Sequence, residues 1–117
     1  MQKDDLVYIA HMLDVARSIA AKAADKSRAE FDADDNLQLA LTHLIQTIGE
    51  AATRVSQTFR ELHPQIPWKS IIGMRHRVIH DYLEVDYDQV WEVVALDIDP
   101  LIAELERIAP LEPPESS

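Results

Sequence analysis

The side chains best suited to chemistry lie in one short stretch, residues 73–82, where an acidic sequence becomes locally basic. Between residues 68 and 82 the charged or titratable groups are Lys69, Arg75, His76, Arg77, His80, Asp81 and Tyr82. A histidine titrates near neutral pH and can move a proton to or from a ribose hydroxyl. A guanidinium can hold a phosphate through two hydrogen bonds and stabilise charge that develops on it. The combination of Arg75, His80 and Tyr82 therefore suits phosphodiester cleavage without a metal.

The same residues allow two other interpretations. Arg75 falls on the inward-facing stripe of the expected helix, so it could be a buried arginine paired with a carboxylate such as Glu50 or Asp81. His76 and His80 are four residues apart and could share a metal ion. No nearby residue completes a ligand set with recognisable spacing, and the glutamate of a His-Glu-x-x-His motif is absent. We therefore expect no metal and no cofactor.

Helix geometry limits how these groups can meet. Each residue advances by about 100° around an ideal helix, so Arg75 and Tyr82 share one stripe, while His76 and His80 share a neighbouring one. On a regular helix Arg75 and His80 are splayed by well over a right angle. They converge only if the helix ends or bends near His80, or if a second copy of the chain supplies the other half. A site at a dimer interface would satisfy this geometry.

Apolar residues at spacings of three and four indicate the helices that must position this stretch. They predict helices over residues 4–24, 36–62 and 68–82, with Asp4 or Asp5 and then Asp34 or Asp35 as caps of the first two. Phe31 is the one large apolar residue of the first connection and should anchor it to the core. Gly49 inside the second helix costs about 1 kcal/mol relative to alanine, which indicates close approach of another helix or of a dimer mate.

A fourth helix should follow a connection over residues 83–87, capped by Asp86 or Asp88. Pro100 should kink it or split it near residues 97–99, because proline cannot continue the helical hydrogen bonds. Four amphipathic helices with mostly short connections predict an all-α, up-down four-helix bundle. We expect one domain over residues 1–109 and a frayed tail over residues 110–117.

Composition narrows the classes of function. The 117 residues contain no cysteine, which excludes disulfides, thiolate nucleophiles and cysteine-ligated zinc. The sequence has no apolar run of about 20 residues and no secretory signal at its start, so we expect a cytoplasmic protein without a membrane span. The net charge of −10 opposes non-specific binding to nucleic acid. Any RNA contact must be confined to a local basic pocket or an assembled interface, although the charge alone could also serve solubility.

Several short motifs together resemble a known family. They are Arg75-x4-His80-x-Tyr82, Ile48-Gly49-Glu50-Ala51-Ala52, Pro64-Gln65-Ile66-Pro67-Trp68, Gly73-Met74-Arg75, His80-Asp81-Tyr82 and Phe31-x-x-Asp34. The combination is similar to the HepT-like branch of the HEPN superfamily, which contains ribonuclease toxins. The similarity spans most of the chain from Leu6 to Leu105. One departure is His76, where many members carry asparagine directly after the arginine.

The resemblance implies a function and a set of roles. The protein would be an all-α homodimer with two motifs facing a shared cleft, and a metal-independent endoribonuclease toxin of a type VII-like toxin–antitoxin pair. Arg75 and His80 would be catalytic and His76 would assist, with Glu50 and Asp81 supporting the motif. The partner would be an MntA-like nucleotidyltransferase antitoxin that neutralises the toxin by AMP transfer to Tyr82, which makes the toxin a phosphoprotein.

Two alternatives belong to other classes of protein. The chain could be a non-catalytic helical partner that binds a nucleotide or docks a minimal nucleotidyltransferase, with Arg75 and Tyr82 as contact residues. It could also be a plain structural dimer with a buried Arg75. Toxicity on expression of the chain alone, relieved by His80→Ala, would separate the toxin from the first alternative.

Overall fold

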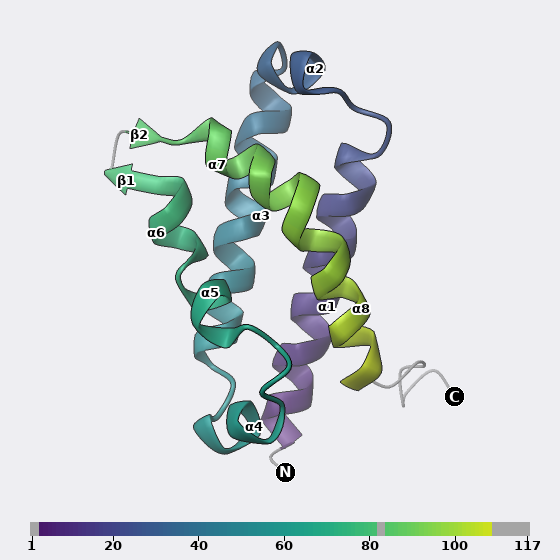
Figure 1. Ribbon diagram of the computed structural model, residues 1–117, viewed down its shortest axis with the longest axis vertical. Coiled ribbons are helices and arrows are strands. Elements are labelled where there is room, and N and C mark those ends of the chain that lie inside the picture. Colours follow the sequence, from purple (N-terminus) through teal and green to yellow (C-terminus); the bar gives the residue numbers. More distant parts are fainter. Residues whose placement is uncertain (1–2, 82–83, 109–117) are drawn as a thin grey trace.

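The fold is all-α, as predicted, with one short hairpin. The computed structural model describes residues 3–81 and 84–108, and for Lys3, His80 and Asp81 the backbone alone. Its elements are α1 (Lys3–Ala23), α2 (Arg28–Asp32), α3 (Asp35–Thr53), α4 (Gln57–Leu62), α5 (Trp68–Ile72), α6 (Met74–Val78), β1 (Ile79–Asp81), β2 (Glu84–Val85), α7 (Tyr87–Glu92), the π-helical segment η1 (Val93–Asp97) and α8 (Ile98–Ile108). The long helices α1 and α3 pack together, and α8 packs along α1 (Figure 1). The expected four helices are thus divided into shorter segments, and the expected tail lies outside the described residues.

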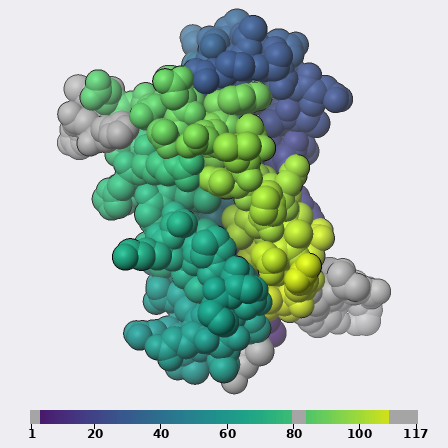
Figure 2. All heavy atoms as spheres, in the orientation of Figure 1, coloured from purple at the N-terminus to yellow at the C-terminus, as the bar shows by residue number. Residues whose placement is uncertain are grey.

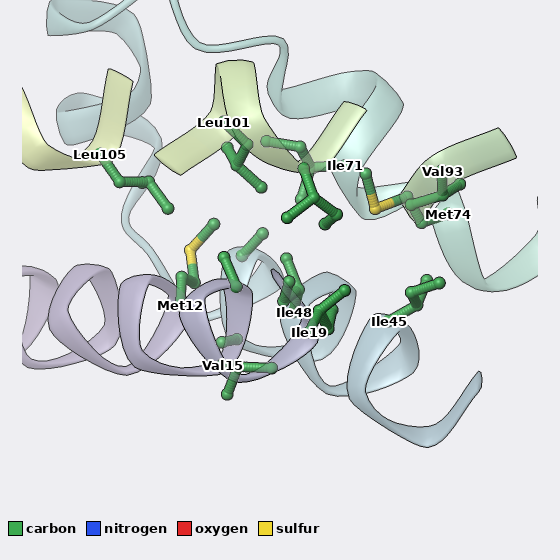
Figure 3. Close-up of a cluster of buried hydrophobic side chains, with 14 of the residues drawn as sticks. Met12, Val15, Ile19, Ile45, Ile48, Ile71, Met74, Val93, Leu101 and Leu105 are labelled. Atoms are coloured by element: carbon green, nitrogen blue, oxygen red, sulfur yellow. The ribbon is translucent and has the colours of Figure 1, made fainter. Parts of the chain in front are cut away.

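The core sits between α1, α3 and the segments that cross them. On α1, Ile9, Met12, Ala16 and Ile19 are all fully buried, which is the helical spacing that predicted this element. Figure 3 shows Met12 and Ile19 in one cluster with Ile45 and Ile48 of α3 and with side chains from α5, α6 and α8. The predicted anchor of the first connection is confirmed: Phe31 is 0% exposed and lies 5.0 Å from the ring centre of Trp91. No helix within residues 3–81 and 84–108 is long and apolar enough to span a membrane.

The second predicted helix, 36–62, is wrong as a single element, although its cap Asp34 is confirmed. The chain breaks after α3 because Ser56 starts a new helix, with its hydroxyl oxygen accepting a 3.1 Å hydrogen bond from the Phe59 amide. Asp5 fixes this break from the first turn of α1. Its carboxylate is 2% exposed and accepts from the Ser56 amide at 2.7 Å and the Ser56 hydroxyl at 2.8 Å. Asp5 therefore joins two helices and does not cap its own.

The third predicted helix, 68–82, is also wrong as one element. It turns at Gly73 between α5 and α6 and ends at Val78, where Ile79 adopts an extended conformation with φ −123° and ψ 104°. The expected connection over residues 83–87 is corrected too, because Glu84–Val85 forms strand β2 and pairs antiparallel with β1.

The fourth predicted helix begins as expected and is split as expected. Asp86 is its cap, with a side-chain oxygen accepting from the Gln89 amide. The split consists of five π-helical residues, η1, after which α8 begins two residues before Pro100. The Ile98 amide donates to the Val93 carbonyl, five residues back. Such π segments are frequent at functional sites.

Candidate functional site

Gly49 sets how closely the segment with the basic motif approaches α3. A side-chain carbon added at Gly49 would lie 3.2 Å from the carbonyl oxygen of Ile71 and 3.7 Å from that of Ile72. The backbone of α5 therefore rests directly on α3, which confirms the close approach predicted from this glycine. The next helix, α6, follows after the turn at Gly73 and also packs on α3.

Arg75 projects outward from α6. Its neighbour Met74 is 3% exposed and Val78 is fully buried, so these two side chains form the inward face and leave Arg75 and His76 exposed. The prediction of an inward-facing, buried Arg75 is wrong for this reason. Among the described residues Arg75 has no carboxylate partner, and Glu50, which is exposed on α3, has no cation partner.

His80 lies on the strand that follows the end of α6. The hairpin pairs Ile79 with Val85 and Asp81 with Glu84, so two steps on β1 match one step on β2 and the irregularity falls at His80. Such bulges redirect a side chain and occur often beside active sites. The Asp86 amide donates to the Val78 carbonyl at 2.7 Å and closes the base of the hairpin.

The backbone therefore meets one condition for convergence of Arg75 and His80, because the helix ends two residues before His80. Three predicted site residues are described in part or not at all. For His80 and Asp81 the backbone is described, while their side chains and the whole of Tyr82 lie outside the described residues. Within the part that is described, no three His, Cys, Asp or Glu side chains are arranged to hold a metal ion.

A second arginine of the motif, Arg77, fixes α6 to the fourth helical region. Its Nε donates to Gln89 at 2.6 Å, its Nη1 to Asp97 at 2.9 Å and its Nη2 to Glu92 at 2.7 Å. Burial works against the guanidinium charge, but the hydrogen bonds and charges of Glu92 and Asp97 outweigh it and raise the pKa of Arg77. We call these four residues the Arg77 clamp. It holds in place the short helix that carries Arg75 and leads into β1.

The π-helical segment makes the clamp possible. Glu92 and Asp97 are five residues apart, which on an ideal α-helix places them about 140° apart. In π-helical geometry residues five apart are hydrogen-bonded neighbours, one turn above the other. Both carboxylates can therefore reach Arg77. The clamp was not predicted from the sequence, where its signal is weak: three polar residues lie at irregular spacing on one helix, opposite an arginine in a basic stretch.

Comparisons with known proteins identify the family of the chain. The chain matches the family described as "Ribonuclease HepT-like" over residues 12–108. It is 33% identical over 101 residues to a protein of Caldanaerobacter subterraneus named "Putative RNase", covering 86% of this chain and 90% of that one. It is 35% identical over 79 residues to "Probable ribonuclease HepT" of Thermococcus cleftensis, covering 68% of this chain and 72% of that protein. No solved structure matches it. The expected resemblance is confirmed, and the chain belongs to the ribonuclease HepT-like family.

Proposed function

We propose that the chain is a metal-independent endoribonuclease and the toxin of a toxin–antitoxin pair. One observation carries the proposal: in a chain of the ribonuclease HepT-like family, Arg75 is exposed without a described ion-pair partner, and the helix beyond it ends just before a bulge at His80. An unpaired guanidinium on a helix that ends two residues before a histidine suits an anionic phosphodiester substrate.

The proposed reaction needs only groups of the substrate and of this motif. The ribose 2′-oxygen attacks the adjacent phosphorus, and the bond to the 5′-oxygen of the next nucleotide breaks. His80 either accepts the proton of the 2′-hydroxyl or supplies the proton to the leaving 5′-oxygen, and His76 carries out the other transfer. Arg75 stabilises the charge on the phosphate oxygens in the transition state. The products are a 2′,3′-cyclic phosphate and a free 5′-hydroxyl.

A dimer would complete the site, with two motifs facing one cleft and His76 of either copy assisting proton transfer. Glu50 and Asp81 would support the motif from its edge. A cognate nucleotidyltransferase would neutralise the enzyme by transferring AMP to Tyr82. The added nucleotide would bring bulk and negative charge to the cleft and repel RNA.

Expression of the chain alone, with and without the candidate nucleotidyltransferase, tests these proposals. We expect the wild-type chain to arrest growth and His80→Ala to relieve the arrest at equal protein level. Intact mass after co-expression should show one or more AMP increments that map to Tyr82, with loss of RNA cleavage. A chain that neither arrests growth nor cleaves RNA, yet binds the nucleotidyltransferase, would support the non-catalytic docking partner instead.

A further inference from the structure

The positive charge of this acidic protein is concentrated in one segment. Residues 54–77 contain Arg54, Arg60, Lys69, Arg75 and Arg77 with Glu61 as the sole acidic residue, whereas the whole chain has 11 basic and 21 acidic residues. This segment forms α4, α5 and α6, which follow one another along one side of the molecule (Figures 1 and 2). The side with the proposed catalytic arginine is therefore the basic side.

Most of these cations are not neutralised by the protein itself. Elsewhere Arg17, Arg28 and Arg107 each lie within 4.0 Å of a carboxylate, as Arg77 does in its clamp, while Lys22 and Lys26 have no such partner in the part of the chain that the structure describes. Within residues 3–81 and 84–108, Arg60, Lys69 and Arg75 have no such partner. The Nε atom of Arg60 is buried and has no hydrogen-bond acceptor among the described residues. A buried donor without an acceptor is destabilising, so an anion bound beside this guanidinium would be favourable.

A hollow between α4 and α5 brings two of these cations together. It has a volume of about 710 Å³, and its lining includes Gln57, Arg60, Glu61, Trp68, Lys69 and Ser70. Arg60, Lys69 and Ser70 offer hydrogen-bond donors, while the Gln57 amide donates to the Glu61 carboxylate at 3.1 Å. The Trp68 indole offers none, because it donates to the His63 carbonyl at 3.0 Å. The donors and net charge of the hollow suit an anion with several oxygens.

The hollow and the proposed catalytic arginine lie on the same helical segment. Lys69, Ile72 and His76 follow one another at spacings of three and four on the helical segment from α5 to α6. The Gly73 and Arg77 amides each bond to a carbonyl four residues back, so the segment stays helical on both sides of its turn. Six residues of helix correspond to about 9 Å, which places Lys69 within a short run of nucleotides of Arg75.

We propose that Arg60 and Lys69 bind a backbone phosphate of single-stranded RNA that flanks the bond cleaved at Arg75 and His80. This inference rests on the proposed ribonuclease function and adds a second contact with the substrate. It explains how a chain of net charge −10 can hold a polyanion. Binding is concentrated where cations of the protein have no carboxylate partner. Phosphate contacts do not distinguish one base from another, so the subsite contributes affinity for RNA and no sequence preference.

Salt-dependent binding of a non-cleavable 2′-O-methyl oligonucleotide tests the subsite. Each lost phosphate contact reduces the slope of log K against log salt by about 0.7 for a single strand. Arg60→Gln and Lys69→Gln should each weaken binding about threefold to tenfold and reduce the slope by at most this amount. Lys22→Gln and Lys26→Gln remove the same charge near the junction of α1 and α2, at the far end of the molecule from α4 (Figure 1). These controls should leave affinity and slope near wild type.

Cleavage assays distinguish failure of the proposed subsite from failure of the proposed ribonuclease function. With active protein, kcat/KM for an oligonucleotide should fall several-fold more than for a dinucleotide in Arg60→Gln and Lys69→Gln. The subsite would be overturned, even if the wild type cleaves RNA, by either of two results. One is wild-type affinity and slope in both Arg60→Gln and Lys69→Gln, and the other is a loss in the lysine controls as large as the loss in these variants. Binding that depends on Arg60 and Lys69 without any cleavage would keep the subsite and reject the ribonuclease. Wild-type protein that neither binds nor cleaves would reject both.

Discussion

Replacing Arg77 by methionine keeps most of the length of the side chain and removes its charge and donors. Three hydrogen bonds are lost, to Gln89, Glu92 and Asp97, at distances between 2.6 and 2.9 Å. Two carboxylates then remain close together without their cation. Because α6 is only five residues long and leads directly into β1, it depends on this contact for its position.

The size of the effect follows from exposure. Hydrogen bonds to charged groups contribute about 1.5–3 kcal/mol when buried, and exposed ion pairs about 0.2–1 kcal/mol. The side chains of Arg77, Glu92 and Asp97 are 33%, 46% and 36% exposed, which places the clamp between these limits. We expect Arg77→Met to lower the free energy of unfolding by about 2–4 kcal/mol. For a domain of this size that corresponds to a fall in Tm of roughly 8–15 °C.

Thermal unfolding followed by circular dichroism measures this loss, and a cycle with Glu92→Gln isolates the direct pair. Arg107→Met is the matched control, because Arg107 is 73% exposed and lies 3.9 Å from Glu104. It should change stability by less than about 0.5 kcal/mol. At temperatures where the Arg77→Met variant is folded, we expect kcat to fall more than KM rises, because Arg75 loses its alignment. A variant with wild-type Tm would refute the clamp as a structural support.

Three further predictions concern the elements that hold the site. Gly49→Leu should destabilise the protein by about 1–3 kcal/mol in urea unfolding, because its first side-chain carbon would already lie 3.2 Å from the Ile71 carbonyl oxygen; an unchanged midpoint would contradict the tight packing. Asp5→Ala should cost about 2–4 kcal/mol through two lost hydrogen bonds, and a cycle with Ser56→Ala that shows no coupling would exclude the link. Phe31→Ala should cost about 3–5 kcal/mol, since Phe31 is 0% exposed; a loss below about 1 kcal/mol would show that it is not an anchor.

Local signals in the sequence were sufficient for parts of the fold. The extent of α1 and the caps Asp34 and Asp86 were predictable, because an apolar stripe and a capping aspartate act over a few residues. Pro100 likewise indicated that the fourth helix is interrupted, and the structure has the π-helical segment η1 shortly before it. Gly49 indicated close packing correctly, because a helical glycine has few other uses.

The errors arose where distant contacts override local periodicity. The break at Ser56 depends on Asp5, which lies 51 residues earlier in the chain, so the apolar stripe continues through a point where the helix does not. The outward position of Arg75 follows from the turn at Gly73 and from Met74 taking the inward place. The Arg77 clamp required the π-helical geometry, which no spacing rule for an ordinary helix anticipates.

RNA cleavage in the presence of EDTA by wild-type protein, Arg75→Ala and His80→Ala tests the central claim most directly. Single-stranded RNA and the same strand with 2′-deoxy sugars serve as the paired substrates. We predict that wild-type protein cleaves the RNA alone and leaves 2′,3′-cyclic phosphate ends, and that both variants lose at least 100-fold in rate, roughly the contribution of a positioned proton-transfer group, while remaining folded. Cleavage of the deoxy strand, a requirement for added metal, or full activity of His80→Ala would contradict it.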